Sequence, residues 1–323
     1  MSTTSPRTSP RTSPPRRRAN RPRTATESIA AGDLVEEWTD ALLYSEIAPK
    51  CSRSAVILTG FRPESAHTTA CLASVFSLHN ETVNIWTHLV GAALFLGLLG
   101  SELAAGTTAP TSYRAFYCAV AGLCFVGSAA FHVLANHPRY YARAWIVDLG
   151  GMFALIGAGA GSHTYFSVGT SHGALVLYGH VALCVGCSAL SFVLMAGMVA
   201  RQAASGGAAD ETALRGMLPA VLVCASFSYW LLACSHVAIL EDGATAWRCF
   251  WQLGPEWFTW GVGMMIWKLQ VPEVWAPYRF DLFGASHQVH HVMCVACAWW
   301  HLQNIEQMQS WRPAAEAPAL FNM

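Results

Sequence analysis

The sequence predicts an all-α integral membrane protein with seven transmembrane helices, and three observations carry that prediction. The chain has 323 residues, of which 54% are hydrophobic and only 12% are charged, whereas charged residues make up about 25% of an average soluble domain. The mean hydropathy is positive, at +0.35. The apolar residues also gather into runs of about 20, the length of helix that crosses about 30 Å of hydrocarbon.

Seven such runs follow one another, and each must be helical because the bilayer core offers no water to unpaired backbone groups. We expect them to form one compact bundle over residues 83–304. The predicted spans are 84–104, 113–135, 144–168, 173–197, 215–240, 245–267 and 284–303.

The chain on either side of the bundle has a different composition. Residues 1–32 are predicted to be a disordered basic tail, because residues 1–24 hold seven arginines, a repeated RTSP unit and no large apolar residue. Residues 33–82 are predicted to be a pre-membrane cytoplasmic segment that begins with a short amphipathic helix at 33–46. Residues 305–323 are predicted to be a short C-terminal tail.

The basic residues predict the orientation of the bundle. Ten of the 19 Lys and Arg residues precede the first span. With a cytoplasmic N-terminus, the inner loops hold six more and the outer segments only three. Because cytoplasmic loops are enriched in Lys and Arg, we predict a cytoplasmic N-terminus and an extracytoplasmic C-terminus. The sequence leaves open whether this is the plasma membrane or an internal one, and it leaves the oligomeric state open. No nucleic-acid partner is expected.

Eleven cysteines include two pairs with CxxC spacing, Cys184/Cys187 and Cys294/Cys297. Both pairs lie inside apolar runs with no matching pair nearby. Because a buried free cysteine behaves as a small hydrophobic residue, we expect neither pair to bind metal or form a disulfide.

Ionisable groups inside the spans are costly and usually mark a functional site. The predicted topology places His132 one to two turns before the cytoplasmic end of the second span and Asp148 about one turn into the third. The histidines of SHQVHH, residues 286–291, enter the seventh span at a similar depth. Three helices therefore bring these groups to one level. Glu256 is either an inward-facing polar contact or part of a substrate cavity, and we leave it unassigned.

The spacing of the histidines predicts a metal site. His287 and His291 are four residues apart and share one helix face, although His290 also shares a face with His287 and stays an alternative. Three neutral imidazoles with an open fourth position are the ligands of a catalytic zinc. We therefore predict that His132, His287 and His291 bind Zn²⁺. A single buried histidine is more often a hydrogen-bonded core residue, so the prediction depends on their convergence.

Two further side chains suit hydrolysis at such a metal. Asp148 is predicted to accept the proton of a metal-activated water or to orient that water. Ser128, four residues before His132, shares its helix face and is predicted to position the water or the oxyanion.

Several stretches resemble the progestin and adipoQ receptor family, which includes the adiponectin receptors and the bacterial haemolysin-III-like proteins. They are GFRP at 60–63, SLHNETVNIWTHLVGA at 77–92, SAAFH at 128–132, Asp148, and SHQVHH at 286–291. The resemblance covers residues from about 55 to 303. It implies seven helices, an intracellular N-terminus and zinc near the cytoplasmic face.

The resemblance also carries over to single residues. The family's zinc histidines match His132, His287 and His291, and its aspartate and serine match Asp148 and Ser128. The residue before the last histidine is aromatic or apolar in adiponectin receptors, whereas it is histidine here.

For function, the resemblance implies two hypotheses. Adiponectin receptors are described as ceramidases, so the first is a zinc-dependent hydrolase of the amide bond of a ceramide-like membrane lipid. Other members are described as steroid or hormone receptors. The alternative is thus a receptor or sensor for an extracellular or lipid ligand, in which zinc only ties the second, third and seventh helices together. Transport is less favoured, because no chain of charged groups continues across the predicted bundle.

Overall fold

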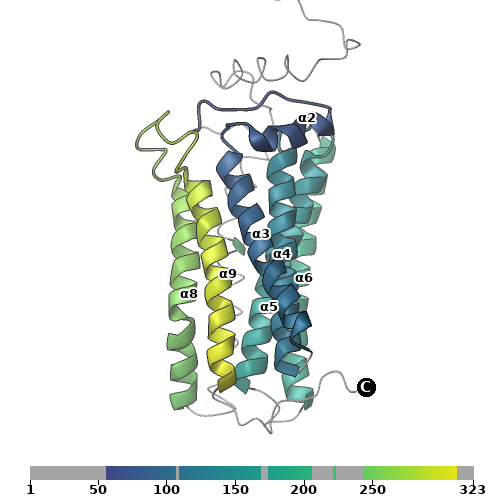
Figure 1. Ribbon diagram of the computed structural model, residues 1–323, viewed down its shortest axis with the longest axis vertical. Coiled ribbons are helices and arrows are strands. Elements are labelled where there is room, and N and C mark those ends of the chain that lie inside the picture. Colours follow the sequence, from purple (N-terminus) through teal and green to yellow (C-terminus); the bar gives the residue numbers. More distant parts are fainter. Residues whose placement is uncertain (1–55, 107–108, 169–173, 206–220, 223–242, 311–323) are drawn as a thin grey trace, which may run out of the picture.

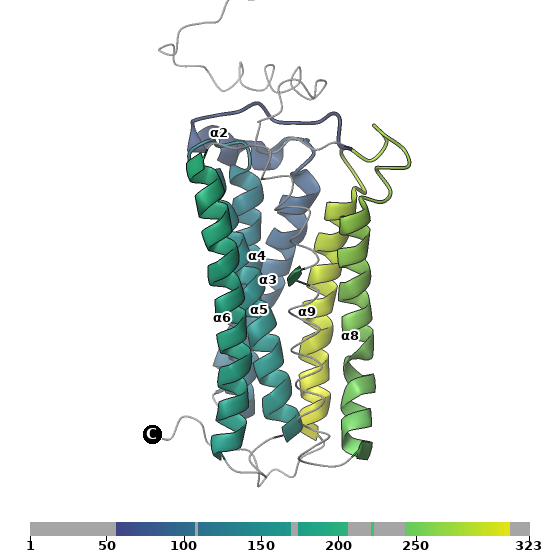
Figure 2. The same cartoon turned by 180° about the vertical axis from the view of Figure 1, so that it is seen from behind.

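The computed structural model describes residues 56–106, 109–168, 174–205, 221–222 and 243–310, and every regular element in these ranges is helical. Six long helices run side by side as a bundle (Figure 1), which confirms the predicted all-α class. They are α3 (Thr82–Ala104), α4 (Ala109–Leu134), α5 (Tyr141–Val168), α6 (Ala174–Ser205), α8 (Gly243–Leu269) and α9 (Ser286–Ser310). The short α2 (Thr68–Ala73) and the 3-10 turn η3 (Ser74–Phe76) lie across one end of the bundle, as Figures 1 and 2 show.

Six of the seven predicted spans fall in the described chain, and each matches one long helix. The helices overrun the apolar runs, because backbone hydrogen bonds continue a helix beyond the residues that suit lipid. Thus α6 continues to Ser205, and α9 continues to Ser310 and includes the first residues of the predicted tail. The predicted helix 33–46, the basic tail and, apart from residues 221–222, the predicted span 215–240 lie outside the described residues.

The six helices differ in how apolar they are. By length and composition α3, α4, α5 and α6 are each able to cross a membrane. Helices α8 and α9 are as long but more polar: α9 carries four histidines, and α8 carries a glutamate, a glutamine and five tryptophans. The glutamate and three of the four histidines are buried in the bundle interior, and they mark where the site lies.

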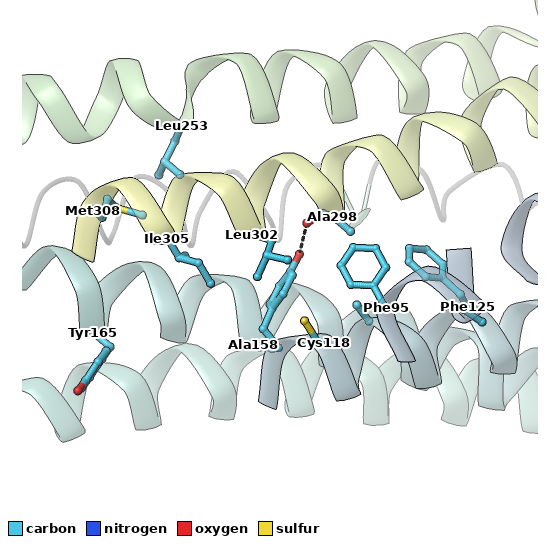
Figure 3. Close-up of a cluster of buried hydrophobic side chains, with 13 residues drawn as sticks. Phe95, Cys118, Phe125, Ala158, Tyr165, Leu253, Ala298, Leu302, Ile305 and Met308 are labelled. Carbon is cyan, nitrogen blue, oxygen red and sulfur yellow. Dashed lines mark hydrogen bonds between the residues drawn. The ribbon is translucent and has the colours of Figure 1, made fainter. Parts of the chain in front are cut away.

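An apolar core joins α3, α4 and α5 to α8 and α9 (Figure 3). The rings of Phe95 and Phe125 pack at 5.7 Å between centroids, and Leu302 of α9 is a fully buried member of the same cluster. The hydroxyl of Tyr117 donates a hydrogen bond to the Ala298 carbonyl across the helices, at 3.2 Å. Close packing and such interhelical hydrogen bonds hold helices together in a bilayer.

One close helix crossing positions the candidate catalytic residues. A Cβ added at Gly151 of α5 would lie 2.9 Å from the Cα of Cys124 on α4, so glycine lets the two backbones approach closely. Asp148 lies about one turn before Gly151, and Ser128 lies about one turn after Cys124. The crossing therefore sets Asp148 beside Ser128.

Arg62 closes the end of α4. The residue is only 3% exposed, and its guanidinium donates to the carbonyl oxygens of His132 and Val133 and to the Ser74 hydroxyl. These carbonyls belong to the last turn of α4, which has no further helical donors. Burial lowers the pKa of Arg62 to about 10, although nearby Glu81 opposes the shift. The side chain is charged at neutral pH and fixes the turn that carries His132.

His79 lies just before α3 and is held as a neutral ring. Its Nε2 donates to the Ser74 carbonyl at 3.0 Å, and its Nδ1 accepts from the backbone N–H of Glu81 at 3.1 Å. A second ring proton, on Nδ1, would point at the backbone N–H of Glu81, so the charged ring is disfavoured. Burial, together with the charge of Arg62, lowers the pKa of His79 to about 3 despite the opposing charge of Glu81.

Candidate metal centre

Three predicted ligands meet where α4 ends and α9 begins. His132 lies in the last turn of α4, and His287 and His291 lie in the first two turns of α9. One ligand nitrogen from each ring lies within 4.8 Å of the other two. The ring centroids are 4.6 to 5.2 Å apart. The structure thus holds a largely buried histidine triad at metal-binding distance.

In two of the rings, those of His132 and His291, hydrogen bonding at Nδ1 leaves Nε2 to bind a metal. The Nδ1 of His132 lies 2.7 Å from Oε2 of Glu81, so its proton is donated to the carboxylate. The buried Nε2 of His132 has no hydrogen-bond partner among the described residues. In His291, Nδ1 donates to the Asn84 carbonyl at 3.2 Å, and Nε2 lies 3.2 Å from Nε2 of His287. Such partners fix the tautomer of metal-binding histidines.

The spacing suits a small divalent ion. Zinc binds imidazole nitrogen at about 2.0–2.1 Å in a tetrahedron, which places ligand nitrogens about 3.3 Å apart. The Nε2 atoms of His287 and His291 are 3.2 Å apart, close to this separation, and a ring nitrogen of His132 lies within 4.8 Å of the other two ligand nitrogens. The residues present therefore fit the metal that the sequence predicts.

Glu81 was missed in the sequence-based prediction of the site. It is the N-cap residue of α3, and it accepts hydrogen bonds from His132 and from Asn84 Nδ2, both at 2.7 Å. Burial raises the pKa of the Glu81 carboxyl, but His132, Asn84 and Arg62 outweigh it and hold the pKa below its usual range. The carboxylate of Glu81 thus contacts Nδ1 of His132, the ring nitrogen that is not needed for the metal. The available signal was the spacing of Glu81, Asn84 and His88, which places all three on one helix face.

His290, the alternative ligand, belongs to a different environment. Its ring stacks on Trp267 of α8 at 5.0 Å between centroids, and its Nε2 lies 3.3 Å from Sγ of Cys294. His291 instead stacks on His88 at 3.7 Å and faces the other two ligands. The helix rotation between neighbouring residues turns His290 toward α8. The structure therefore groups His291, and not His290, with His132 and His287.

Asp148 and Ser128 lie beside the triad in the same cavity. Both side chains are buried, and the Ser128 hydroxyl is a hydrogen-bond partner of the Asp148 carboxylate. The other carboxylate oxygen, Oδ1, is buried without a partner in the described part of the chain. An acceptor of this kind is costly unless water or a ligand satisfies it.

The cavity has a volume of about 500 Å³ and runs between α3, α4, α5, α8 and α9. At one end it contains the triad, Glu81, Ser128 and Asp148. Its middle is mainly apolar, with Phe125, Leu155, Trp260 and Met264 among the lining residues. Such a shape suits an amphiphile whose polar part lies at the triad.

A second group of polar side chains, which we call the outer polar cluster, lies toward the opposite end of the bundle, where Glu256 and His301 line the same cavity. It consists of Ser162, Glu256, His301 and Asn304. Glu256, left unassigned from the sequence, is thus a buried partner of His301.

The two CxxC pairs differ in position: Cys294 and Cys297 of α9 line the cavity, and Sγ of Cys297 donates to the Glu256 carbonyl at 3.7 Å, whereas Cys184 and Cys187 lie on α6. Cys184, Cys187, Cys294 and Cys297 are all free thiols. Cys184 is fully buried within the apolar helix α6, as expected of a small hydrophobic residue.

Comparisons with known proteins show the family to which the chain is similar. A family model described as haemolysin-III related matches residues 76–302. The adiponectin receptor protein of Drosophila melanogaster is 28% identical over 78% of this chain, which spans 56% of the length of that relative. The ADIPOR-like receptor IZH1 of Eremothecium gossypii is 26% identical over 81% of this chain and 82% of its own length. Progestin and adipoQ receptor family member 3 of Mus musculus is 23% identical over 85% and 88%, respectively.

Proposed function

The chain belongs to the haemolysin-III related family of integral membrane proteins, and from this premise we propose that it is a zinc-dependent hydrolase of lipid amides. The proposed substrate is ceramide-like: its amide lies near the headgroups and its chains lie in the bilayer. The activity is proposed to serve lipid signalling or homeostasis.

One observation carries the proposal. Three histidines, two of which have hydrogen bonds that fix the tautomer, line one end of a largely apolar cavity. A serine hydroxyl and a carboxylate oxygen that has no partner among the described residues lie at the same end. Three nitrogen ligands leave a coordination position open, which distinguishes catalytic from structural zinc sites. An apolar cavity next to that position accepts a hydrocarbon chain and excludes bulk water.

Each residue has a separate task in this proposal. His132, His287 and His291 hold the ion, and Glu81 keeps His132 oriented. Bound zinc supplies a Lewis acid that polarises the amide carbonyl and acidifies a water molecule.

The carboxylate and the hydroxyl handle the proton and the developing charge. Asp148 accepts the proton of the attacking water at Oδ1 and later delivers it to the leaving amine nitrogen. Ser128 orients Asp148 in the resting site and donates to the oxyanion that forms from the carbonyl oxygen. Both residues are positioned by the close crossing of α4 and α5.

Fatty acid release from ceramide by the purified, zinc-loaded protein in nanodiscs tests this function. We expect the wild type to release fatty acid and Asp148→Asn to be at least about 100-fold slower, because general base catalysis is lost. The variant should keep its zinc and its melting temperature, since the amide retains the shape of the carboxylate. Stoichiometric zinc without any fatty acid release by the wild type would contradict the proposal.

A receptor or sensor with structural zinc is the second candidate, and one observation favours it. The triad joins α4 to α9, so a bound ion ties together helices that are far apart in the sequence. This candidate predicts that His132→Gln lowers the melting temperature in zinc and that no variant forms a lipid product. Sustained fatty acid release by the wild type decides against it.

A further inference from the structure

The outer polar cluster forms an ordered series of contacts that ends at a hydroxyl group. Gln252 Nε2 donates to Asn304 Oδ1 at 3.0 Å, and Asn304 Nδ2 donates to Glu256 Oε2 at 3.0 Å. The Glu256 carboxylate oxygens lie 2.9 and 3.1 Å from Nδ1 of His301. On the other side of that ring, Nε2 lies 2.8 Å from Oγ of Ser162.

We propose that Ser162, His301 and Glu256 form a second acyl-transfer site, with Ser162 as the nucleophile, for the ester of a long-chain fatty acid. The distances match the arrangement in which a carboxylate orients an imidazole and the imidazole activates a hydroxyl. All three residues are more than nine-tenths buried, at 3%, 3% and 8% exposure respectively.

The protonation pattern fits the resting state of such a site. With a proton on Nδ1 donated to Glu256, Nε2 of His301 is an acceptor. The Ser162 hydroxyl then has two acceptors within reach, this Nε2 and the Gly159 carbonyl at 2.9 Å. Rotation of one hydroxyl hydrogen from Gly159 to His301 prepares the serine for attack.

The surroundings accommodate a fatty acyl chain. His301 and Glu256 line the cavity that contains the histidine triad. Ser162 lines a second cavity of about 550 Å³ between α4, α5 and α6, which is lined mainly by aromatic, aliphatic and glycine residues such as Phe116, Phe153 and Phe192. Ser162 thus lies in the wall between two cavities, and the second one suits a hydrocarbon chain.

The reaction has two balanced steps. First, Oγ of Ser162 forms a bond to the ester carbonyl carbon and its proton passes to Nε2 of His301. The bond to the alcohol oxygen then breaks, and that oxygen takes the proton. Second, water attacks the acyl carbon and gives a proton to Nε2, after which Oγ leaves with that proton and the fatty acid is released.

A hexadecyl fluorophosphonate tests the nucleophile directly, because phosphonylation requires an activated oxygen and releases fluoride. The full-length protein in nanodiscs is incubated with the probe, and the labelled peptide is mapped by mass spectrometry. We expect one adduct, at Ser162, and no adduct in Ser162→Ala.

His301→Gln should be labelled about 100-fold more slowly, because the general base is lost. Ser101 is the matched control. Like Ser162, its hydroxyl donates to the backbone carbonyl three residues earlier in the helix, at 2.7 Å to Leu98, but Ser101 is exposed. Ser101→Ala should label at the wild-type rate.

Removal of zinc should leave the labelling unchanged, which separates this site from the proposed zinc hydrolase. A folded wild type without an adduct at Ser162 would overturn the proposal. Equal labelling rates for the wild type and His301→Gln would overturn it as well, because a cluster that only ties the helices together does not activate the hydroxyl.

Discussion

Replacing Glu81 with glutamine should weaken zinc binding without removing a ligand. Glu81 Oε2 accepts from Nδ1 of His132 at 2.7 Å, the short distance of a charge-assisted hydrogen bond. The glutamate side chain is only 17% exposed, so water screens this contact weakly. Glutamine preserves the length of the side chain and removes its charge.

The magnitude follows from the two kinds of hydrogen bond. A bond to a charged group contributes about 1.5–3 kcal/mol and a neutral one about 0.5–1.5 kcal/mol. The difference of about 1–1.5 kcal/mol corresponds to a dissociation constant about 5- to 13-fold higher. This range overlaps the 10- to 100-fold loss that is typical when a partner of a metal-binding histidine is changed.

Competition with a zinc chelator measures the change in Kd on purified protein. Glu64→Gln is the matched control, because Glu64 is exposed on the same segment before α3 and its variant should bind zinc as the wild type does. If Glu81→Gln also had the wild-type Kd, Glu81 would not orient the ligand and the account of His132 would be refuted.

Two further predictions concern stability. His79 favours folding in its neutral form, and its pKa of about 3 lies below the ordinary value of 6.5, so its contribution is full above pH 6.5 and is lost as the pH falls towards 3. The loss is about 2 kcal/mol at pH 5, and the melting temperature of the metal-free wild type should fall more between pH 7 and pH 5 than that of His79→Gln. Gly151→Ala forces α4 and α5 apart and should cost about 1–3 kcal/mol, seen as a lower melting temperature, whereas Gly97→Ala, with no atom within 4 Å of the added Cβ, should not.

A different result would contradict each of these two predictions. Equal pH dependence in the wild type and His79→Gln would show that His79 is not held neutral by the fold. An unchanged melting temperature in Gly151→Ala would show that α4 and α5 tolerate a wider separation, and the positions of Ser128 and Asp148 would then need another explanation.

The histidine triad was predictable because its evidence is local. Depth along a span and the spacing of His287 and His291 on one helix face are properties of short stretches. The sequence did not give the rotation of the last helix about its axis, which decides between His290 and His291. The structure shows that His290 is turned toward α8. Hydropathy likewise located the six described spans, although it could not locate their ends, because a helix continues wherever its hydrogen bonds do.

The remaining contacts depend on packing between distant segments. Glu81 and His132 are 51 residues apart, and Glu256 and His301 are 45 residues apart. No periodic pattern links such pairs, and α8 is difficult to orient because tryptophans occur on several of its faces. The partner of Glu256 therefore became visible only in the folded chain.

The zinc content of the purified protein, after loading and removal of loosely bound metal, tests the central claim most directly. The wild type should hold one zinc ion per chain, His291→Gln should hold none, and the neighbouring His290→Gln should hold one, because only His291 faces His132 and His287. A wild type that retains no zinc, or equal losses in the two variants, would contradict the account.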